Sequence, residues 1–356
     1  MVKKVLFVGL GSAGQRHLRN LQEILGIEIE IIAYRCHKSE RVFNSNMQVI
    51  EDETLTSKYK IQEFDDFGKA LSDKPDIVVI ANPNSMHMSF VLETARKGID
   101  LFIEKPLSTS FEHTQELIEV VKKKGIICQV GFQYRYHPCI RLAKEYLEKK
   151  KLGEIVSVNA EVGESLTRMH SYEDYRSMLE ARKELGGGVV LCQSHELDYL
   201  FWLFGMPVSV NSSGGKRSGL DIDVEDSSTT FFRYKDGCNE FPIILHQDFL
   251  QYPAVRKCKI VGTEGRMEID LLSNSFLHEE YSSNERRQKC FENFVRNDMF
   301  FEEMRDFLNC VETRKTPKCD VQAAFASMKM GLAIKESFKD KRELKFDEFF
   351  GVEERF

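Results

Sequence analysis

A glycine-rich turn near the N-terminus constrains the fold of this chain more than any other feature. Gly9, Gly11 and Gly14 follow a short apolar run and open a stretch with helical spacing. This order of strand, tight turn and helix is typical of a dinucleotide-binding βαβ unit. Gly9 permits the turn, Gly11 lets the backbone approach a pyrophosphate, and Gly14 lets the helix pack on the strand. Ser12 and Ala13 are expected to offer the backbone N–H groups of the helix N-terminus to the phosphates.

Composition predicts a globular protein with two domains of unequal type. The chain has 356 residues, of which 42% are hydrophobic and 30% charged, enough to bury a large core. Its net charge of −6 provides no basic field for nucleic acid, and its apolar runs are too short to span a membrane. The N-terminus lacks the apolar core of a signal peptide, and the nine cysteines include no C-x-x-C pair. We therefore expect a cytoplasmic protein without a metal site, a nucleic-acid partner or a membrane partner.

Two regions of different periodicity divide the chain. Residues 1–131 alternate strand and helix patterns, which predicts a doubly wound parallel sheet of the α/β class. Residues 132–356 carry several strand patterns joined by short turns, so we predict an α+β domain with one large, mostly antiparallel sheet. Such a sheet must cover one of its faces, and a homodimer or homotetramer that associates through it is expected.

A basic cluster follows the second predicted strand. An NAD-specific site usually places an acidic residue there, where it binds the ribose 2′-OH. This chain has Arg35 instead, with Lys38 and Arg41 close behind. Because arginine can bind a 2′-phosphate bidentately, the cluster favours NADP as the cofactor, and NAD stays open. The alternative is a solvated basic turn.

Two further polar clusters end predicted strands, at the edge where parallel sheets bind their ligands. Asn82 and Asn84 are predicted to contact the cofactor, and His87, about one helical turn later, could contact a ribose or only cover the start of a helix. Glu104 and Lys105 form a charged pair at the end of a buried strand, which costs desolvation unless the pair is used. We expect Glu104 to accept a hydrogen bond from a ribose hydroxyl. Lys105 is expected to donate to a substrate oxygen beside the nicotinamide.

The order of these motifs resembles that of the Gfo/Idh/MocA oxidoreductase family. The matching parts are the glycine turn, Asn82-Pro83-Asn84, Glu104-Lys105-Pro106, the segment 131–138, and the triple glycine 186–188 that leads to His195. The resemblance spans nearly the whole chain. It implies a Rossmann domain, an open-faced antiparallel sheet, bound NAD or NADP, and sugar or cyclitol substrates.

The resemblance also implies roles for single residues. Lys105 matches the family's catalytic lysine, and His195 matches the histidine that accepts or gives the substrate proton. Within the matching segment 131–138, Gln133 is expected to contact the cofactor, and Arg135 and Tyr136 the substrate.

One position departs from the family pattern. Cys192 stands where the family commonly carries Asp, three residues before His195. Asp198 shares a helix face with His195 and is expected to orient its imidazole. Cys192 and Asp198 are therefore expected at the substrate. Arg168 and Tyr172, in a polar-aromatic loop, are expected there too, unless that loop is a surface or oligomer contact.

The leading prediction is an NAD(P)-dependent dehydrogenase or reductase. It would move a hydride to or from a carbinol carbon of a sugar, nucleotide sugar or cyclitol, in the setting of surface-glycan biosynthesis that similar sequences suggest. One alternative is an enzyme that retains NAD and uses transient oxidation for elimination or glycosidic cleavage. Another is a non-catalytic dinucleotide-binding protein, which Cys192 in place of Asp supports.

Overall fold

The chain divides into two compact units that interleave in sequence. The computed structural model describes residues 2–26, 28–35, 39–44, 48–170, 172–283 and 285–350. The first unit combines residues 1–133 with 296–325, and the second combines 134–295 with 326–356. The sequence predicted one boundary, after residue 131, and did not predict that residues 296–325 belong to the first unit.

The first unit is built on a six-stranded parallel sheet, which confirms the predicted α/β class. The strand order is β5-β2-β1-β6-β7-β8, and every neighbouring pair is parallel. The strands are β1 (Lys4–Val8), β2 (Glu30–Tyr34), β5 (Gln62–Phe64), β6 (Ile77–Ile80), β7 (Asp100–Glu104) and β8 (Cys128–Gly131). The chain also forms a small separate hairpin, β3 (Val42–Phe43) and β4 (Val49–Ile50).

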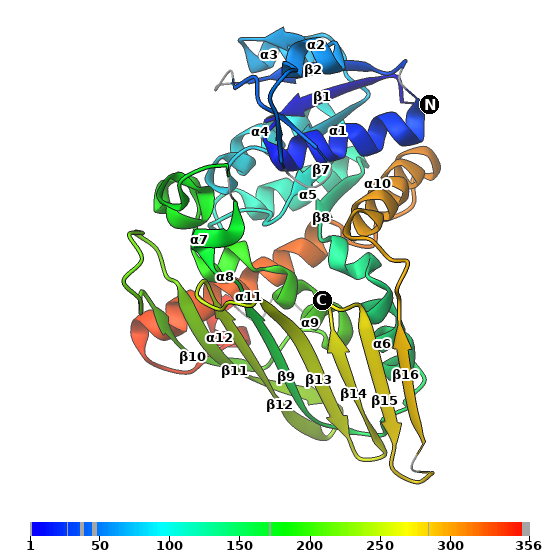
Figure 1. Ribbon diagram of the computed structural model, residues 1–356, viewed down its shortest axis with the longest axis vertical. Coiled ribbons are helices and arrows are strands. Elements are labelled where there is room, and N and C mark those ends of the chain that lie inside the picture. Colours follow the sequence, from blue (N-terminus) through cyan, green and yellow to red (C-terminus); the bar gives the residue numbers. More distant parts are fainter. Residues whose placement is uncertain are drawn as a thin grey trace. The chain divides into compact units, whose positions relative to one another are not determined.

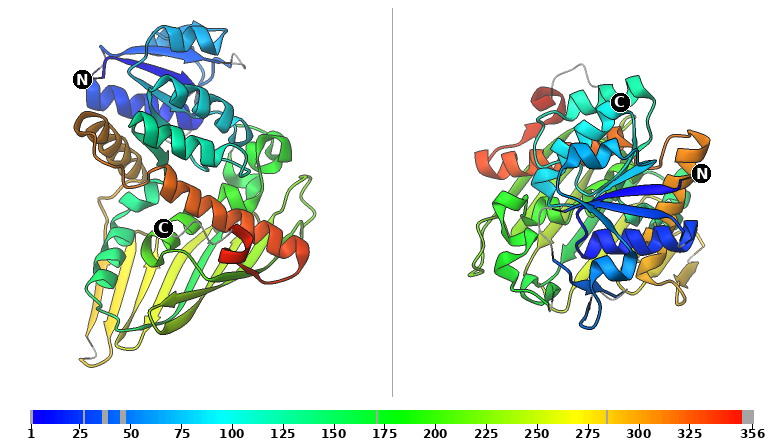
Figure 2. Two further views of the ribbon diagram at one scale, coloured as in Figure 1. Left: turned by 180° about the vertical axis from the view of Figure 1, so that it is seen from behind. Right: turned by 90° about the horizontal axis from the view of Figure 1, so that it is seen from above.

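Helices cover both faces of this parallel sheet. They are α1 (Ser12–Leu25), α2 (Leu55–Tyr59), α3 (Phe67–Ser72), α4 (His87–Lys97), α5 (Thr114–Lys124) and α10 (Arg296–Thr313). Helices α1 and α10 lie together on one face, and α4 and α5 on the other (Figure 2). Met304 and Phe307 of α10 are fully buried in the same core cluster as Val5 and Phe7 of β1. Arg314 follows α10 and binds Asp100 at the start of β7 through contacts of 2.6 and 3.0 Å, which fixes the returning segment to the sheet.

The second unit contains a nine-stranded sheet in the order β16-β15-β14-β13-β9-β12-β11-β10-β17 (Figure 1). Its strands are β9 (Ile155–Gly163), β10 (Ser209–Gly215), β11 (Ser227–Asp236), β12 (Asn239–Asp248), β13 (Val255–Gly262), β14 (Gly265–Asp270), β15 (Ser275–Glu280), β16 (Arg286–Cys290) and β17 (Leu344–Lys345). Strands β9 and β12 pair in parallel, and all other neighbours are antiparallel. The prediction of a large, mostly antiparallel sheet is therefore confirmed.

The two faces of this sheet differ in what covers them. Helices α6 (Pro138–Glu148), α8 (Val189–Cys192), α9 (His195–Phe204) and α11 (Val321–Asp340) lie on one face (Figures 1 and 2). Side chains that point toward them, such as Val158, Ile243 and Ile260, are at most 1% exposed. Two short helices, α7 (Leu166–Met169) and α12 (Phe346–Phe350), complete the unit. None of the helices described here combines the length and apolar character needed to cross a bilayer.

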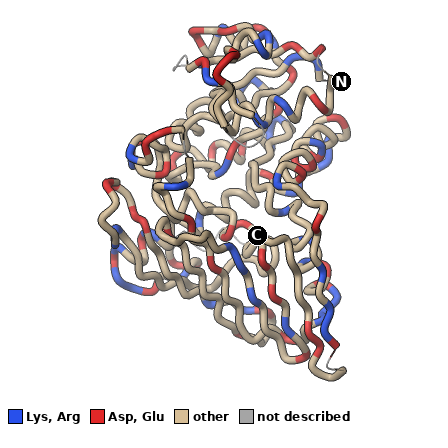
Figure 3. Tube along the Cα trace, viewed as in Figure 1, with Lys and Arg blue, Asp and Glu red and all other residues tan. Residues whose placement is uncertain are grey.

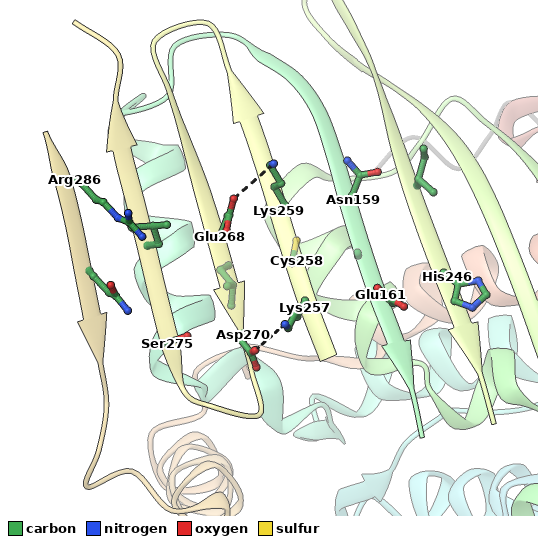
Figure 4. A pocket seen from close by; sticks show the side chains of 15 residues that line it. Asn159, Glu161, His246, Lys257, Cys258, Lys259, Glu268, Asp270, Ser275 and Arg286 are labelled. Carbon is green, nitrogen blue, oxygen red and sulfur yellow. Dashed lines mark ion pairs between the residues drawn. The ribbon is translucent and has the colours of Figure 1, made fainter. Parts of the chain in front are cut away.

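Residues of both charges are interleaved along the strands of the nine-stranded sheet (Figure 3). Across β13 and β14, the ammonium of Lys257 lies 3.3 Å from Asp270, and that of Lys259 lies 3.6 Å from Glu268 (Figure 4). These side chains line a hollow of about 700 Å³ that also includes Ile244 of β12. The outer face is thus mixed in charge, with apolar groups between the ion pairs.

Candidate active site

The glycine turn after β1 lies against the end of β6. Gly9 has φ = +90°, and a Cβ there would stand 2.6 Å from the carbonyl oxygen of Ala81. A Cβ on Gly14 would stand 2.5 Å from the carbonyl oxygen of Gly9, so both positions need glycine to bring strand and helix together. At Gly11, by contrast, no atom of the described residues other than its chain neighbours lies within 4 Å of the Cβ position. This open approach to the N-terminus of α1, where Ser12 and Ala13 are the first residues, fits the pyrophosphate of a dinucleotide.

His87 joins the ends of β6 and β7. Its Nδ1 lies 2.9 Å from the carbonyl oxygen of Pro106, and its Nε2 lies 2.9 Å from that of Asn82. Burial lowers the pKa of His87, although both contacts favour the protonated ring. Since both ring nitrogens face backbone oxygens, the expectation of a ribose contact is replaced by a structural role.

Asn82 and Asn84 stand at the same strand end with different environments. Both side-chain amide atoms of Asn82 are buried, with no hydrogen-bond partner among the described residues. Asn84 is 6% exposed and begins the short turn that precedes α4. Their contacts with a cofactor stay a prediction.

Glu104 is held by a histidine that the sequence reasoning missed. The Nε2 of His17, on α1, lies 2.5 Å from Oε1 of Glu104, and the backbone N–H of Lys105 donates to Oε2 at 3.2 Å. Burial alone would raise the pKa of Glu104, but the hydrogen bond with His17 and the charge of Lys105 bring it below its usual value. With its side chain 12% exposed and bound to His17, Glu104 supports the Lys105 backbone, and its contact with a ribose hydroxyl stays a prediction. The available signal was that His17 lies one turn after Gly14, on the helix face that packs on the sheet.

Arg35 is turned into the protein. Its guanidinium binds the carboxylates of Glu63 and Glu40 and the carbonyl oxygen of Ser39, and its side chain is 3% exposed. The group expected to receive a 2′-phosphate is therefore occupied by internal acceptors. Of the other two basic residues, Arg41 is exposed and Lys38 lies outside the described residues.

In the second unit, a glycine turn and a glutamine set the position of His195. A Cβ on Gly188, where φ is +105°, would stand 2.4 Å from the carboxylate of Glu225. After α8, Nε2 of Gln247 on β12 donates to the carbonyl oxygen of Gln193 at 3.0 Å. These contacts anchor the turn between α8 and α9, so that Cys192 ends the first helix, half-buried, and His195 begins the second.

The carboxylate expected to orient His195 has other partners. Asp198 receives two hydrogen bonds from Arg135, at 2.8 and 2.7 Å, and one from Ser327 at 3.1 Å. Both members of this ion pair have side chains at most 2% exposed. Arg135 and Asp198 therefore bind each other inside the second unit, which corrects the expectation that they face substrate. The imidazole of His195, 6% exposed, lies instead against the ring of Tyr134, with 4.9 Å between centroids.

The remaining predicted residues differ in exposure. Gln133 and Tyr136 are each 4% exposed, in the short helical turn Gln133–Tyr136 that also carries Tyr134. Arg168 is exposed, with its guanidinium carbon 4.1 Å from the ring centroid of Tyr252. Tyr172 stacks on His170 at 5.1 Å. Substrate contacts by Arg168, Tyr172, Tyr136 and Cys192 stay predictions.

Comparison with known proteins decides the family. Residues 3–132 match the family described as "Oxidoreductase family, NAD-binding Rossmann fold", and residues 144–346 match its "C-terminal alpha/beta domain". The chain belongs to the Gfo/Idh/MocA oxidoreductase family. As a member, it is an NAD(P)-dependent oxidoreductase that binds a nicotinamide cofactor and acts on a small molecule.

Named relatives illustrate the range of this oxidoreductase family. The chain is 26% identical to scyllo-inositol 2-dehydrogenase (NAD(+)) of Bacillus subtilis over 280 residues, which cover 76% of this chain and 78% of the relative. It is 22% identical to myo-inositol 2-dehydrogenase of Thermotoga maritima over 355 residues, covering 97% and 98%. The WlbA dehydrogenase of Bordetella pertussis, solved with NADH and UDP-GlcNAcA, has the same fold, with a TM-score of 0.77, 20% identity and coverage of 97% and 99%.

Proposed function

We propose that this oxidoreductase transfers a hydride between a nicotinamide cofactor and a carbinol carbon of a sugar, nucleotide sugar or cyclitol. One observation carries the proposal. Gly9, Asn82 and Lys105 follow β1, β6 and β7, three adjacent parallel strands, so the phosphate-binding turn and the lysine share one edge of the sheet. In open α/β sheets this edge is where ligands bind. Relatives that act on inositols and a relative bound to a nucleotide sugar support the substrate class.

Two side chains would act on the substrate oxygen: one would stabilise its charge and the other would accept its proton. The nicotinamide supplies the hydride acceptor when the cofactor is bound. Lys105 donates a hydrogen bond to the carbinol oxygen and stabilises the negative charge that develops as its proton leaves. The imidazole of His195 accepts that proton during oxidation and returns it during reduction. Glu104 and His17 hold the backbone at Lys105 in place.

We also propose NAD rather than NADP as the preferred cofactor. The carboxylates of Glu40 and Glu63 hold the Arg35 guanidinium at the end of β2, where a 2′-phosphate would be placed. Two carboxylates beside that position repel a phosphate, whereas they leave the ribose hydroxyls of NAD undisturbed. The sequence favoured NADP because of Arg35 and left NAD open, and the ion pairs of Arg35 support the NAD alternative.

The experiment is turnover of the purified protein with a panel of inositols, free sugars and UDP-sugars, followed by the absorbance of the reduced cofactor. We expect reduction of the cofactor with at least one class. Lys105→Met should lower kcat by roughly 10²–10³ while cofactor affinity is kept, because one positioned charge-assisted donor is lost. Lys97→Met, an exposed lysine in α4, is the matched control and should behave as wild type. Lys105→Met turnover within a few-fold of wild type would remove Lys105 from the mechanism.

A further inference from the structure

A partly buried arginine on the nine-stranded sheet contacts two residues beside His195, Tyr134 and Glu196. Arg256 lies on β13, with its side chain 14% exposed. Its Nε lies 3.0 Å from Oε1 of Glu196, and its Nη2 donates to Oε2 of Glu196 at 3.3 Å. Its Nη1 donates to the phenol oxygen of Tyr134 at 2.6 Å, and its guanidinium carbon stands 4.7 Å from the ring centroid of Tyr134. One side chain therefore holds a carboxylate and an aromatic ring at once.

Both of these partners bear directly on His195. Glu196 is the next residue of α9 and is fully buried, so its two contacts with Arg256 tie the first turn of the helix to β13. The ring of Tyr134 lies against the imidazole at 4.9 Å between centroids, tilted by 57°. The ring of Tyr134 also stacks on that of His137, with centroids 5.9 Å apart and an interplanar angle of 16°. The position of the Tyr134 ring is therefore defined by a second contact. The guanidinium of Arg256 thus contacts both the residue that follows His195 in the helix, Glu196, and the ring that packs on its imidazole, Tyr134.

Stability alone does not require such an arrangement. Taking two charges out of water is costly, and well-packed apolar residues often replace a buried ion pair without loss of stability. Arginine suits a positioning task, because its planar group stays charged and forms several hydrogen bonds in fixed directions. Proton transfer is sensitive to position, since a shift of about 1 Å in a reacting group can lower a rate roughly 10²-fold.

We propose that Tyr134, Arg256 and Glu196 are positioning residues that hold the imidazole of His195 in its proton-accepting orientation. The inference rests on the proposed function, in which His195 carries the substrate proton. It assigns no contact with substrate to these three residues. Their effect on the reaction passes through the ring of His195.

Two variants separate this role from a contribution to folding. Arg256→Met/Glu196→Gln removes both charges together, so that no unpaired carboxylate is left buried. Tyr134→Phe keeps the ring but removes the oxygen that Arg256 binds. Arg342→Met, which breaks the exposed ion pair with Asp340, is the matched control in the same unit. Melting temperature reports whether each variant is folded.

Kinetics provide the first readout. We expect kcat to fall roughly 10²-fold in the double variant and roughly tenfold in Tyr134→Phe, with KM and the cofactor Kd within about twofold of wild type. A structural role alone would change the fraction of folded enzyme and leave kcat per folded molecule as it was. Unchanged kcat in both folded variants overturns the proposal.

The imidazole itself provides the second readout, which needs no turnover. The Hε1 proton resonance of His195, assigned with His195→Gln in protein labelled at histidine, carries the ring-current shift of Tyr134. Tyr134→Leu gives its position without the ring. We expect the double variant to move the resonance toward that position and Arg342→Met to leave it in place. A resonance unmoved in the double variant overturns the proposal, as does a moved resonance with unchanged kcat. If wild type turns over no substrate, the proposed function fails, and this resonance still decides whether the three residues hold the ring.

Discussion

The surroundings of Arg35 bear on cofactor choice at the scale of one residue. The guanidinium is nearly inaccessible, and the two glutamates that bind it are themselves partly exposed, at 23% for Glu63 and 40% for Glu40. The charge that reaches the surface at the end of β2 therefore includes the carboxylates of Glu40 and Glu63, beside the exposed Arg41. Burial by itself would raise the pKa of Glu40, yet hydrogen bonds from Thr56 and Arg35 lower it, so the carboxylate stays ionised near neutral pH.

We predict that NAD binds more tightly than NADP, measured by calorimetric titration of both cofactors at low ionic strength. Glu40→Gln should reduce the difference, because it removes one of the repelling charges. Arg35→Gln should lower the melting temperature without selectively weakening NADP. The opposite pattern, tighter NADP binding that Arg35→Gln abolishes, would show that the guanidinium turns outward to the phosphate.

The contacts of single side chains were the feature that the sequence predicted least well. Sequence motifs alone predicted where Lys105 and His195 lie. Lys105 follows β7, and His195 begins α9. The motifs did not predict the partners of Glu104 and Asp198, because each comes from a distant part of the chain: His17 precedes Glu104 by 87 residues, and Arg135 precedes Asp198 by 63. Arg35 binds Glu63, 28 residues later, and also Glu40, only five residues away, and the basic pattern of this segment did not indicate either contact. A charged residue near a strand end predicts a ligand contact only if no other side chain of the folded protein already binds its charged group.

At the scale of an element, two glycines of the turn after β1 have different roles: one is needed for packing and the other for cofactor binding. Gly9 has a positive φ and contacts the backbone of Ala81, so its role is to let the turn pack on β6. Gly11 has an extended conformation with φ = −69°, which any residue can adopt, and the described residues leave space at its Cβ position. Its role therefore concerns what approaches the N-terminus of α1.

We predict different outcomes for two alanine substitutions in this turn. Gly9→Ala should destabilise the protein by about 2–4 kcal/mol, since the backbone conformation and the contact with Ala81 both oppose a Cβ. Gly11→Ala should change the unfolding free energy by less than about 0.5 kcal/mol and still weaken cofactor binding roughly tenfold or more. Denaturant unfolding and cofactor titration measure the two quantities. Unimpaired cofactor binding by Gly11→Ala would contradict the assignment of this turn to the pyrophosphate.

Element prediction succeeded where periodicity was strong. The buried strands β1, β6 and β7 are continuous apolar runs, and they precede the glycine turn, Asn82 and Lys105 as the sequence predicts. Strand β16 was missed because its five residues, Arg286–Cys290, are all exposed and show no apolar alternation. Helix α6 was missed although its signal was present: Pro138 stands at its first turn, and the His137 ring accepts a hydrogen bond from the backbone N–H of Cys139 at 3.2 Å.

For the whole molecule, the uncovered face of the nine-stranded sheet suggests how copies of the chain associate. Ile244 and Phe231 are 40% and 36% exposed, and they face each other across the paired strands β12 and β11. The ion pairs of Lys257 with Asp270 and Lys259 with Glu268 offer both signs of charge, so two copies related by a twofold axis can complement each other. We propose a homodimer or homotetramer that uses this face.

We predict that light scattering of wild type shows a homo-oligomer and that Ile244→Asp lowers its mass. An added carboxylate opposite Phe231 would have to be desolvated at the interface. Leu272→Asp, at an exposed apolar position outside the hollow, is the matched control and should keep the oligomer. Monomeric wild type, or an oligomer untouched by Ile244→Asp, would exclude this face as the interface.

The central claim is that hydride passes between the substrate carbinol carbon and the cofactor. It is tested most directly with a hydroxyl substrate from the panel that carries deuterium at the reacting carbon, followed by mass analysis of the cofactor. We predict that deuterium appears in reduced cofactor released during turnover, and that His195→Ala slows this transfer roughly 10²–10⁴-fold. Deuterium that returns to the product while the cofactor stays bound would indicate transient oxidation. Absence of any transfer, with cofactor tightly bound, would contradict the account.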